Sequence, residues 1–172
     1  MILEYVCPDY RVKHLCDISP KWLKRNGYMK IVVDIDNTLL PRDKNLVGPR
    51  VMTWIRQCHQ MGITVALISN NYGSRIDAIL RQTNCGGATR AGKPMPMAFK
   101  RLVKAMGGGK VLFVGDQLMT DVLGAKLAKQ KVVFCESLGG KELWITRFNR
   151  KIEKFFMGRL IANGMMPKER VL

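Results

Sequence analysis

The sequence predicts an α/β fold of the doubly wound, Rossmann-like kind, a parallel sheet with helices on both faces. Four apolar segments of strand length carry this prediction, at residues 31–33, 63–68, 111–114 and 132–134. Each is rich in β-branched residues and apolar throughout, as strands covered on both faces are. Stretches of helical pattern lie between and after them, at about 50–61, 74–83, 95–106 and 120–129. Strands that alternate with helices in this way indicate parallel pairing.

Two further helices are expected outside this alternation. Ser19 and Pro20 are the residue types of an N-cap and a first helical position, and Gly27 is a typical C-terminal stop. These signals predict a short helix over residues 20–26. From Trp144 to about Asn163 the pattern is that of a longer amphipathic helix.

We expect a single domain over residues 1–172, because no repeat or linker divides the chain. A central core (29–136) would follow an N-terminal extension with the short helix (1–28). A C-terminal amphipathic basic helix and tail (141–172) would follow the core. No apolar run approaches the roughly 20 residues of a membrane-spanning helix, and the first residues lack a signal-peptide pattern. We therefore expect a cytoplasmic protein.

The five cysteines are odd in number, and none belongs to a C-x-x-C pair. This pattern indicates reduced, mostly buried thiols rather than disulfides or a zinc site.

The charge balance is the unusual feature of the composition. Lys and Arg number 29 against 13 Asp and Glu, which gives a net charge of +16. Such a field attracts polyanions, whether nucleic acid, an anionic membrane surface or phosphorylated substrates. The charge alone does not choose between these partners.

Two carboxylates, Asp34 and Asp36, stand at the end of the first predicted strand. In open parallel sheets, ligands bind beyond the carboxyl ends of the strands. One carboxylate of such a pair can attack phosphorus while the other handles the proton of the leaving group. An anionic nucleophile needs a cation beside a phosphate, and Mg²⁺ suits this role because it prefers oxygen ligands.

Later strand ends supply the remaining groups for this chemistry. The segment 69–71, with Asn70 at its centre, offers a hydroxyl and backbone amides to a phosphoryl oxygen. Lys93 offers a fixed positive charge to the transition state. Asp116 and Asp121 offer carboxylates to a metal. Each group alone has a structural explanation, but their order after successive strands favours a catalytic site.

Four segments at these positions resemble the motifs of the haloacid dehalogenase (HAD) superfamily: DIDNT (34–38), LISNN (67–71), GKP (92–94) and GDQLMTD (115–121). The resemblance implies a HAD phosphatase, with Asp34 as nucleophile and Asp36 as general acid/base. An acidic residue at position 36 favours phosphatase chemistry over other activities of the superfamily. Phosphate would be held by Thr38, Ser69, Asn70 and Lys93. Magnesium would be held by Asp34, the Asp36 backbone carbonyl, Asp116 and Asp121.

A narrower resemblance covers nearly the whole chain. The pieces DISP, DIDNTL, GKPM, GDQLMTDVLG and WITRFNR are similar to the YqeG-type subfamily. This subfamily is related to phosphatidylglycerophosphate phosphatases, which implies a phospholipid substrate. The segment 41–45 diverges from the subfamily and is basic. A soluble phosphatase of a sugar phosphate or nucleotide is the first alternative. A basic protein that binds nucleic acid or ribosomes is the second and less favoured one, because no nucleic-acid-binding motif is present.

The spacing of the motifs leaves no room for a cap domain. Thr38 and Ser69 are separated by 30 residues, and Ser69 and Lys93 by 23. One helix with its strand and loops uses each interval. The site is therefore expected to be open.

The C-terminal helix has two contrasting faces at 100° per residue. Its apolar face holds Trp144, Ile145, Phe148, Ile152, Phe155 and Phe156, and its basic face holds Arg147, Arg150, Lys151 and Lys154. Such a helix can lie peripherally on the inner face of a membrane, with its basic side chains toward anionic headgroups. The favoured alternative packs the aromatic face on the protein's own sheet.

Overall fold

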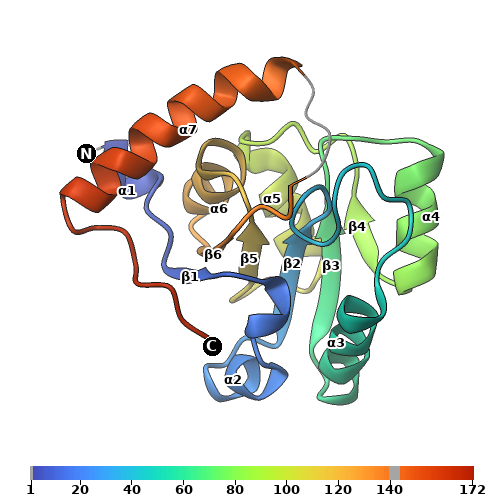
Figure 1. Ribbon diagram of the computed structural model, residues 1–172. Coiled ribbons are helices and arrows are strands. Elements are labelled where there is room, and N and C mark those ends of the chain that lie inside the picture. The colour runs from blue at the N-terminus through green and yellow to red at the C-terminus, as the bar shows by residue number, and fades with distance from the viewer. Residues whose placement is uncertain (1, 140–143) are drawn as a thin grey trace.

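The computed structural model describes residues 2–139 and 144–172, and the side chains of all of these except 144–150. Its centre is one six-stranded sheet in the order β1-β6-β5-β2-β3-β4, with every neighbouring pair parallel (Figure 1). The strands are β1 (Tyr10–Val12), β2 (Lys30–Asp34), β3 (Thr64–Ile68), β4 (Gly86–Ala88), β5 (Leu112–Gly115) and β6 (Lys131–Cys135).

Helices cover both faces of the sheet, which confirms the doubly wound fold. One face packs against α2 (Pro20–Arg25), α3 (Pro49–Gln60) and α4 (Ser74–Thr83), together with the 3₁₀ turn η1 (Leu15–Asp17). The other face packs against α1 (Ile2–Tyr5), α5 (Pro96–Ala105), the π-helical turn η2 (Leu118–Val122), α6 (Leu123–Leu127) and α7 (Trp144–Ala162).

Successive residues of the four central strands enter different cores, as the period of two in a strand requires. In β2, Ile31 and Val33 belong to the core under α3, whereas Val32 belongs to the core under α5. All three side chains are fully buried. This two-sided burial is the reason that the central strands are apolar throughout.

The predicted short helix is confirmed as α2, with its predicted cap. The Ser19 hydroxyl accepts a hydrogen bond from the backbone N–H of Trp22 at 3.0 Å, and Pro20 is the first helical residue. Gly27, two residues after the helix, has φ 72°, a backbone conformation that favours glycine.

The strand β1 was not predicted from the sequence, and β4 was expected only as a short strand somewhere between Ser69 and Lys93. β1 and β4 have three residues each, and β4 is Gly-Gly-Ala, without a β-branched residue. A Cβ on Gly87 would lie 2.4 Å from the Leu67 carbonyl oxygen, so the close approach of β4 to β3 requires glycine there. The helix expected at 120–129 also differs: it begins as the π turn η2 and ends as α6 at Leu127.

The chain ends on the N-terminal extension. The Leu172 N–H donates to the Asp17 carbonyl, and the Ser19 N–H donates to the Leu172 carbonyl, both at 2.8 Å. The tail after α7 therefore packs beside η1 (Figure 1).

The described part of α7 divides its apolar side chains between the core and solvent. Leu160 is fully buried, and Phe156 and Met157 pack against the same core. Phe155, expected on the same face as Phe156, is instead exposed. The continuous aromatic face is thus not seen over the described side chains, because Phe155 and Phe156 point about 100° apart on a helix.

None of the helices in residues 2–139 and 144–172 is both long and apolar enough to cross a bilayer. The five cysteines are free thiols, with Cys58, Cys85 and Cys135 buried and Cys7 and Cys16 partly buried, as predicted.

Strand order reverses beside β2, which pairs with β5 on one side and β3 on the other. The chain moves outward in one direction through β3 and β4, then in the other through β5 and β6. Ligands bind at such a reversal, beyond the carboxyl ends of the strands. The intervals 39–68 and 70–92 hold only loops, α3, β3, α4 and β4, so neither contains a cap domain.

Candidate active site

The backbone turns sharply where β2 ends. The Asn37 N–H donates to the Leu40 carbonyl at 2.8 Å, and the Leu39 N–H donates to the Asp34 carbonyl at 3.2 Å. Asn37 itself has φ 66°, in the left-handed region that Asn tolerates better than most residues. Because of this turn, the carboxylates of Asp34 and Asp36 have separate partners at the same edge of the sheet.

The Lys93 ammonium lies between two of the predicted carboxylates. It donates to Asp34, and to an Asp121 oxygen at 2.6 Å, and the Lys93 side chain is only 5% exposed. Burial by itself would lower the pKa of Lys93, but the Asp121 and Asp34 carboxylates more than offset this and raise the pKa above its usual value. Lys93 therefore stays charged.

Asp34, Asp116 and Asp121 form a buried group whose nearest oxygens all lie within 4.8 Å of one another. Burial is the main cause that raises the pKa of Asp34 well above its usual value, against the opposing charge of Lys93. Burial, and next the Asp121 charge, raise the pKa of Asp116 to about 7. Three ionised carboxylates in one buried site repel one another and lose hydration, so they destabilise the fold unless a cation compensates them. Their oxygens are the ligands that Mg²⁺ prefers, so the donor set fits this ion.

Asp36 is not a member of this carboxylate group and has hydrogen-bond partners of its own. Its oxygens accept hydrogen bonds from the Ser69 hydroxyl at 3.2 Å, the Asn71 amide at 2.7 Å and the Arg75 guanidinium at 2.8 Å. Arg75 also donates from Nε to the Lys44 carbonyl at 2.9 Å. The sequence pattern did not single out Arg75, although its place in the first turn of α4, after the LISNN segment, put it near the edge of the sheet.

Two predicted phosphate ligands contact other site residues. The Thr38 hydroxyl donates to an Asp116 oxygen at 3.4 Å. The Asn70 side chain brackets Lys93: its oxygen accepts from the Lys93 N–H at 2.7 Å, and its NH₂ donates to the Lys93 carbonyl at 3.2 Å. Asn70 thus fixes the loop that presents the Lys93 ammonium.

The loop after β5 is held from two directions. A Cβ on Gly115 would lie 2.3 Å from the Asp121 side chain, so only glycine lets Asp121 approach the end of β5. On α7, the Glu153 carboxylate accepts hydrogen bonds from the backbone N–H groups of Leu118 at 3.0 Å and Met119 at 2.8 Å. Sequence reasoning missed Glu153, which lies 32 residues beyond Asp121 and carries no motif.

The sequence model of the haloacid dehalogenase-like hydrolases matches residues 9–129, well over half of the chain. The chain belongs to this family. All four motif segments fall inside the matched region, and they are the segments that meet at the carboxyl edge of the sheet.

Two curated relatives extend the family comparison over almost the whole chain. The "Probable phosphatase YqeG" of Bacillus subtilis (strain 168) is 32% identical over 98% of this chain and 99% of its own length. The chloroplastic/mitochondrial phosphatidylglycerophosphate phosphatase 1 of Arabidopsis thaliana is 25% identical over 98% of this chain, which spans about half (52%) of that protein. The predicted resemblance to YqeG-type proteins is confirmed, and both names support the predicted phosphatase.

A similar fold is found in the solved structure of the cobalt-bound deoxy-D-mannose-octulosonate 8-phosphate phosphatase YrbI from Haemophilus influenzae. The two structures have a TM-score of 0.54, and their sequences are 15% identical. The match covers 82% of this chain and 92% of that one. At this identity the match establishes the HAD-type fold and leaves the substrate open.

The four basic residues predicted on the C-terminal helix lie on α7, away from the catalytic loops in sequence. Lys151 and Lys154 are exposed. The side chains of Arg147 and Arg150 lie outside the described residues.

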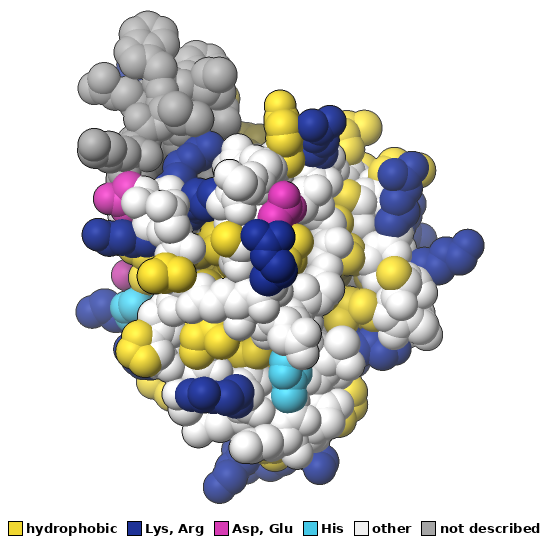
Figure 2. All heavy atoms as spheres, turned by 90° about the vertical axis from the view of Figure 1, so that its right-hand side faces the viewer, with side chains coloured by type: hydrophobic (Ala, Val, Ile, Leu, Met, Phe, Trp, Pro, Cys, Tyr) yellow, Lys and Arg dark blue, Asp and Glu magenta, His cyan; other side chains and the backbone are white. Residues whose placement is uncertain are grey.

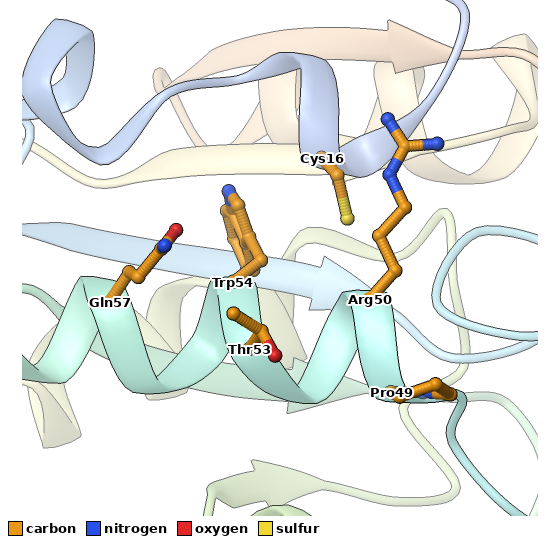
Figure 3. Close-up of a pocket in the computed structure, with 6 residues that line it drawn as sticks. All are labelled: Cys16, Pro49, Arg50, Thr53, Trp54 and Gln57. Atoms are coloured by element: carbon orange, nitrogen blue, oxygen red, sulfur yellow. The ribbon is translucent and has the colours of Figure 1, made fainter.

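A hollow lies on the α3 side of this HAD domain, between α3 and η1 (Figure 3). It has a volume of about 410 Å³ and is lined by Cys16, Pro49, Arg50, Thr53, Trp54 and Gln57. Burial raises the pKa of the Cys16 thiol, which disfavours a reactive thiolate. None of the catalytic candidates lines this hollow.

Proposed function

We propose that this phosphatase is a Mg²⁺-dependent phosphomonoester hydrolase that works through a phosphorylated Asp34. The observation that carries the proposal is the Lys93 ammonium, which contacts both Asp34 and Asp121 in a buried group of three carboxylates. A carboxylate in such a place has little use in packing, because burying charge is unfavourable unless a cation or a reaction requires it.

The proposed first step transfers the phosphoryl group to the protein. An Asp34 oxygen attacks phosphorus, the bond between phosphorus and the ester oxygen breaks, and Asp36 gives a proton to the leaving oxygen. Lys93 stabilises the charge on the transferred group. Thr38, Ser69 and Asn70 with its neighbouring backbone amides are the proposed phosphate contacts.

The proposed second step restores the enzyme. A water attacks phosphorus, Asp36 takes a proton from that water, the bond to Asp34 breaks and inorganic phosphate leaves. Asp36 needs a constant position for both tasks. Arg75 and Asn71, which hydrogen-bond its carboxylate, are proposed as positioning residues that act through Asp36.

The residues proposed to hold Mg²⁺ are Asp34, Asp116 and Asp121, with the Asp36 backbone carbonyl. When bound, the ion supplies positive charge that offsets the repulsion between the Asp34 carboxylate and an anionic phosphate. Carboxylate and carbonyl oxygens make this a hard-ligand site, which favours Mg²⁺ over metals that prefer nitrogen or sulfur.

As substrate we propose phosphatidylglycerophosphate, which would be converted to phosphatidylglycerol. The name of the Arabidopsis relative supports this choice. The uncapped site suits a substrate held at a surface, and the net charge of +16 suits an anionic membrane. The enzyme would then attach peripherally to a membrane.

The test is phosphate release from phosphatidylglycerophosphate in mixed micelles, with and without Mg²⁺, beside a panel of sugar phosphates and nucleotides. The Asp34→Asn variant serves as the blank. Preference for the lipid supports the whole proposal. Faster turnover of a soluble ester would overturn the lipid substrate and leave the chemistry in place. Salt-sensitive RNA binding without turnover of any ester would overturn the enzyme assignment.

A further inference from the structure

Three exposed apolar side chains lie close in sequence to the segments that carry Asn70 and Lys93. Tyr72 is 63% exposed, Met95 is 63% exposed and Met97 is 56% exposed. Tyr72 follows the Ser69–Asn71 segment directly, and Met95 stands two residues after Lys93. Single exposed apolar residues are ordinary on protein surfaces. Two of them in the loops that present the phosphate-binding and cationic groups, and a third in the first turn of α5, require an explanation.

These two loops contact each other beside the site. The Arg90 N–H donates to the Asn71 carbonyl at 3.4 Å, and the Arg90 guanidinium lies 3.7 Å from the centre of the Tyr72 ring. The Asn70 side chain hydrogen-bonds to the backbone of Lys93, two residues before Met95. The segments that carry the three apolar side chains are therefore joined to each other at the carboxyl edge of the sheet.

The charge along this stretch is mainly basic. Arg90 and Lys44 are exposed and Arg42 is half-buried, and in the loops 39–48, 70–73 and 89–95 the single acidic residue is Asp43. Figure 2 shows hydrophobic and basic side chains next to each other at the upper edge of the molecule, the edge at which the strands end. Apolar side chains flanked by basic ones match the boundary between acyl chains and anionic headgroups.

We propose that this rim, consisting of Tyr72, Arg90, Met95 and Met97 with Arg42 and Lys44, docks the protein on an anionic bilayer. The tyrosine and methionines would enter the headgroup region, and the basic side chains would meet lipid phosphates. This inference rests on the proposed function, because the same edge must receive the phosphate of a lipid substrate. Docking through the rim places the open site against the membrane surface.

The described part of α7 is less suited to this role. Its exposed apolar side chains, Phe155 and Ile161, lie six residues apart and thus about 120° apart around the helix. Phe156, Met157 and Leu160 of this helix pack against the core. A helix that lies in a membrane interface needs its apolar side chains on one free face.

The test compares binding of three proteins to vesicles of phosphatidylglycerol and phosphatidylcholine, and to vesicles of phosphatidylcholine alone. The rim variant is Tyr72→Gln/Met95→Gln/Met97→Gln. The matched α7 variant is Phe155→Gln/Ile161→Gln. All five side chains are exposed, so unchanged unfolding temperatures serve as the check on folding.

We expect the wild type to sediment with the anionic vesicles, and less so as salt is raised. The rim variant should bind at least about tenfold more weakly, whereas the α7 variant should stay within about twofold of the wild type. Arg90→Gln should weaken binding about fivefold. Equal binding of the rim variant, loss of binding in the α7 variant alone, or binding of the wild type to neither vesicle would overturn the inference.

Hydrolysis in detergent micelles separates this inference from the proposed function. Suppose that the wild type hydrolyses phosphatidylglycerophosphate in micelles and that the rim variant binds vesicles as tightly as the wild type does. The lipid substrate then stands and the docking surface is refuted. If the wild type hydrolyses only soluble esters yet binds vesicles through the rim, the docking surface stands and the lipid substrate is refuted.

Discussion

Lys93→Met removes the positive charge that lies among the buried carboxylates while keeping the length of an unbranched side chain. In the wild type the ammonium contacts Asp34 and Asp121, and all three side chains are about 5–6% exposed. No solvent can replace the lost charge at this depth. The metal-free variant must therefore either keep uncompensated carboxylates or take up protons.

The burial of this ion pair determines how much stability the Lys93→Met substitution should remove. Removing one partner from a buried ion pair costs about 3–5 kcal/mol. For a chain of this length, each kcal/mol of unfolding free energy shifts the unfolding temperature by about 2–4 °C. Metal-free Lys93→Met should therefore unfold about 6–20 °C below the wild type at pH 8. The deficit should shrink at pH 5, where the carboxylates of raised pKa hold protons, and also in excess Mg²⁺.

Thermal unfolding followed by circular dichroism measures this, in chelator and in Mg²⁺, at both pH values. Lys104→Met is the matched control, because Lys104 is an exposed lysine on α5. Its unfolding temperature should change by less than about 2 °C. If metal-free Lys93→Met unfolds with the wild type at pH 8, the ammonium does not compensate the carboxylates and the electrostatic reasoning is refuted.

Three further predictions concern the chemistry. Asp34→Asn should lower kcat by at least about 10³-fold, because the nucleophilic carboxylate is lost. The unfolding temperature should be unchanged or higher, because Asn has nearly the same shape as Asp. Near-normal turnover of any phosphate ester would refute the phosphoaspartyl route. Arg75→Ala should lower kcat about 10–100-fold with little change in KM, because the Asp36 carboxylate loses the group that positions it. Arg75→Lys should recover part of that loss. Equal kcat values for Arg75→Ala and the wild type would show that Arg75 only anchors its loop. Without metal, the pKa of Asp116 is raised from 3.8 to about 7. Between pH 4 and 7 the folded protein therefore holds a proton that the unfolded protein has released. The free energy of unfolding of the metal-free protein should thus decrease as the pH rises from 4 to 7. Bound Mg²⁺ needs the ionised carboxylate, so its stabilising effect in calorimetry should be larger at pH 8 than at pH 5.5, and a larger effect at pH 5.5 would contradict this assignment.

Patterns that depend on a few neighbouring residues were predicted well. The uniformly apolar segments became β2, β3, β5 and β6 because strands covered on both faces must be apolar on both. The short helix began at Pro20 because its cap needs only Ser19 and the next three residues. The motif segments met at one edge because parallel strands all point the same way.

Features that depend on residues far apart in the chain required the tertiary structure. The three-residue strands β1 and β4 exist because a neighbouring strand supplies their hydrogen bonds, and β4 has no strand-forming side chains of its own. The Arg75–Asp36 ion pair joins residues 39 apart, on α4 and after β2.

The sequence by itself determined the fold class, the order of the motifs and the chemical identity of the catalytic candidates, because these follow from residue types at short spacing. The tertiary structure alone decided which carboxylates gather around Lys93, which one Arg75 holds apart, and which apolar side chains point outward. Tyr72, Met95 and Met97 have the same residue types as side chains that lie in or against the core, and only the tertiary packing leaves these three in solvent. Burial is a property of the whole assembled chain, so no local pattern could assign it.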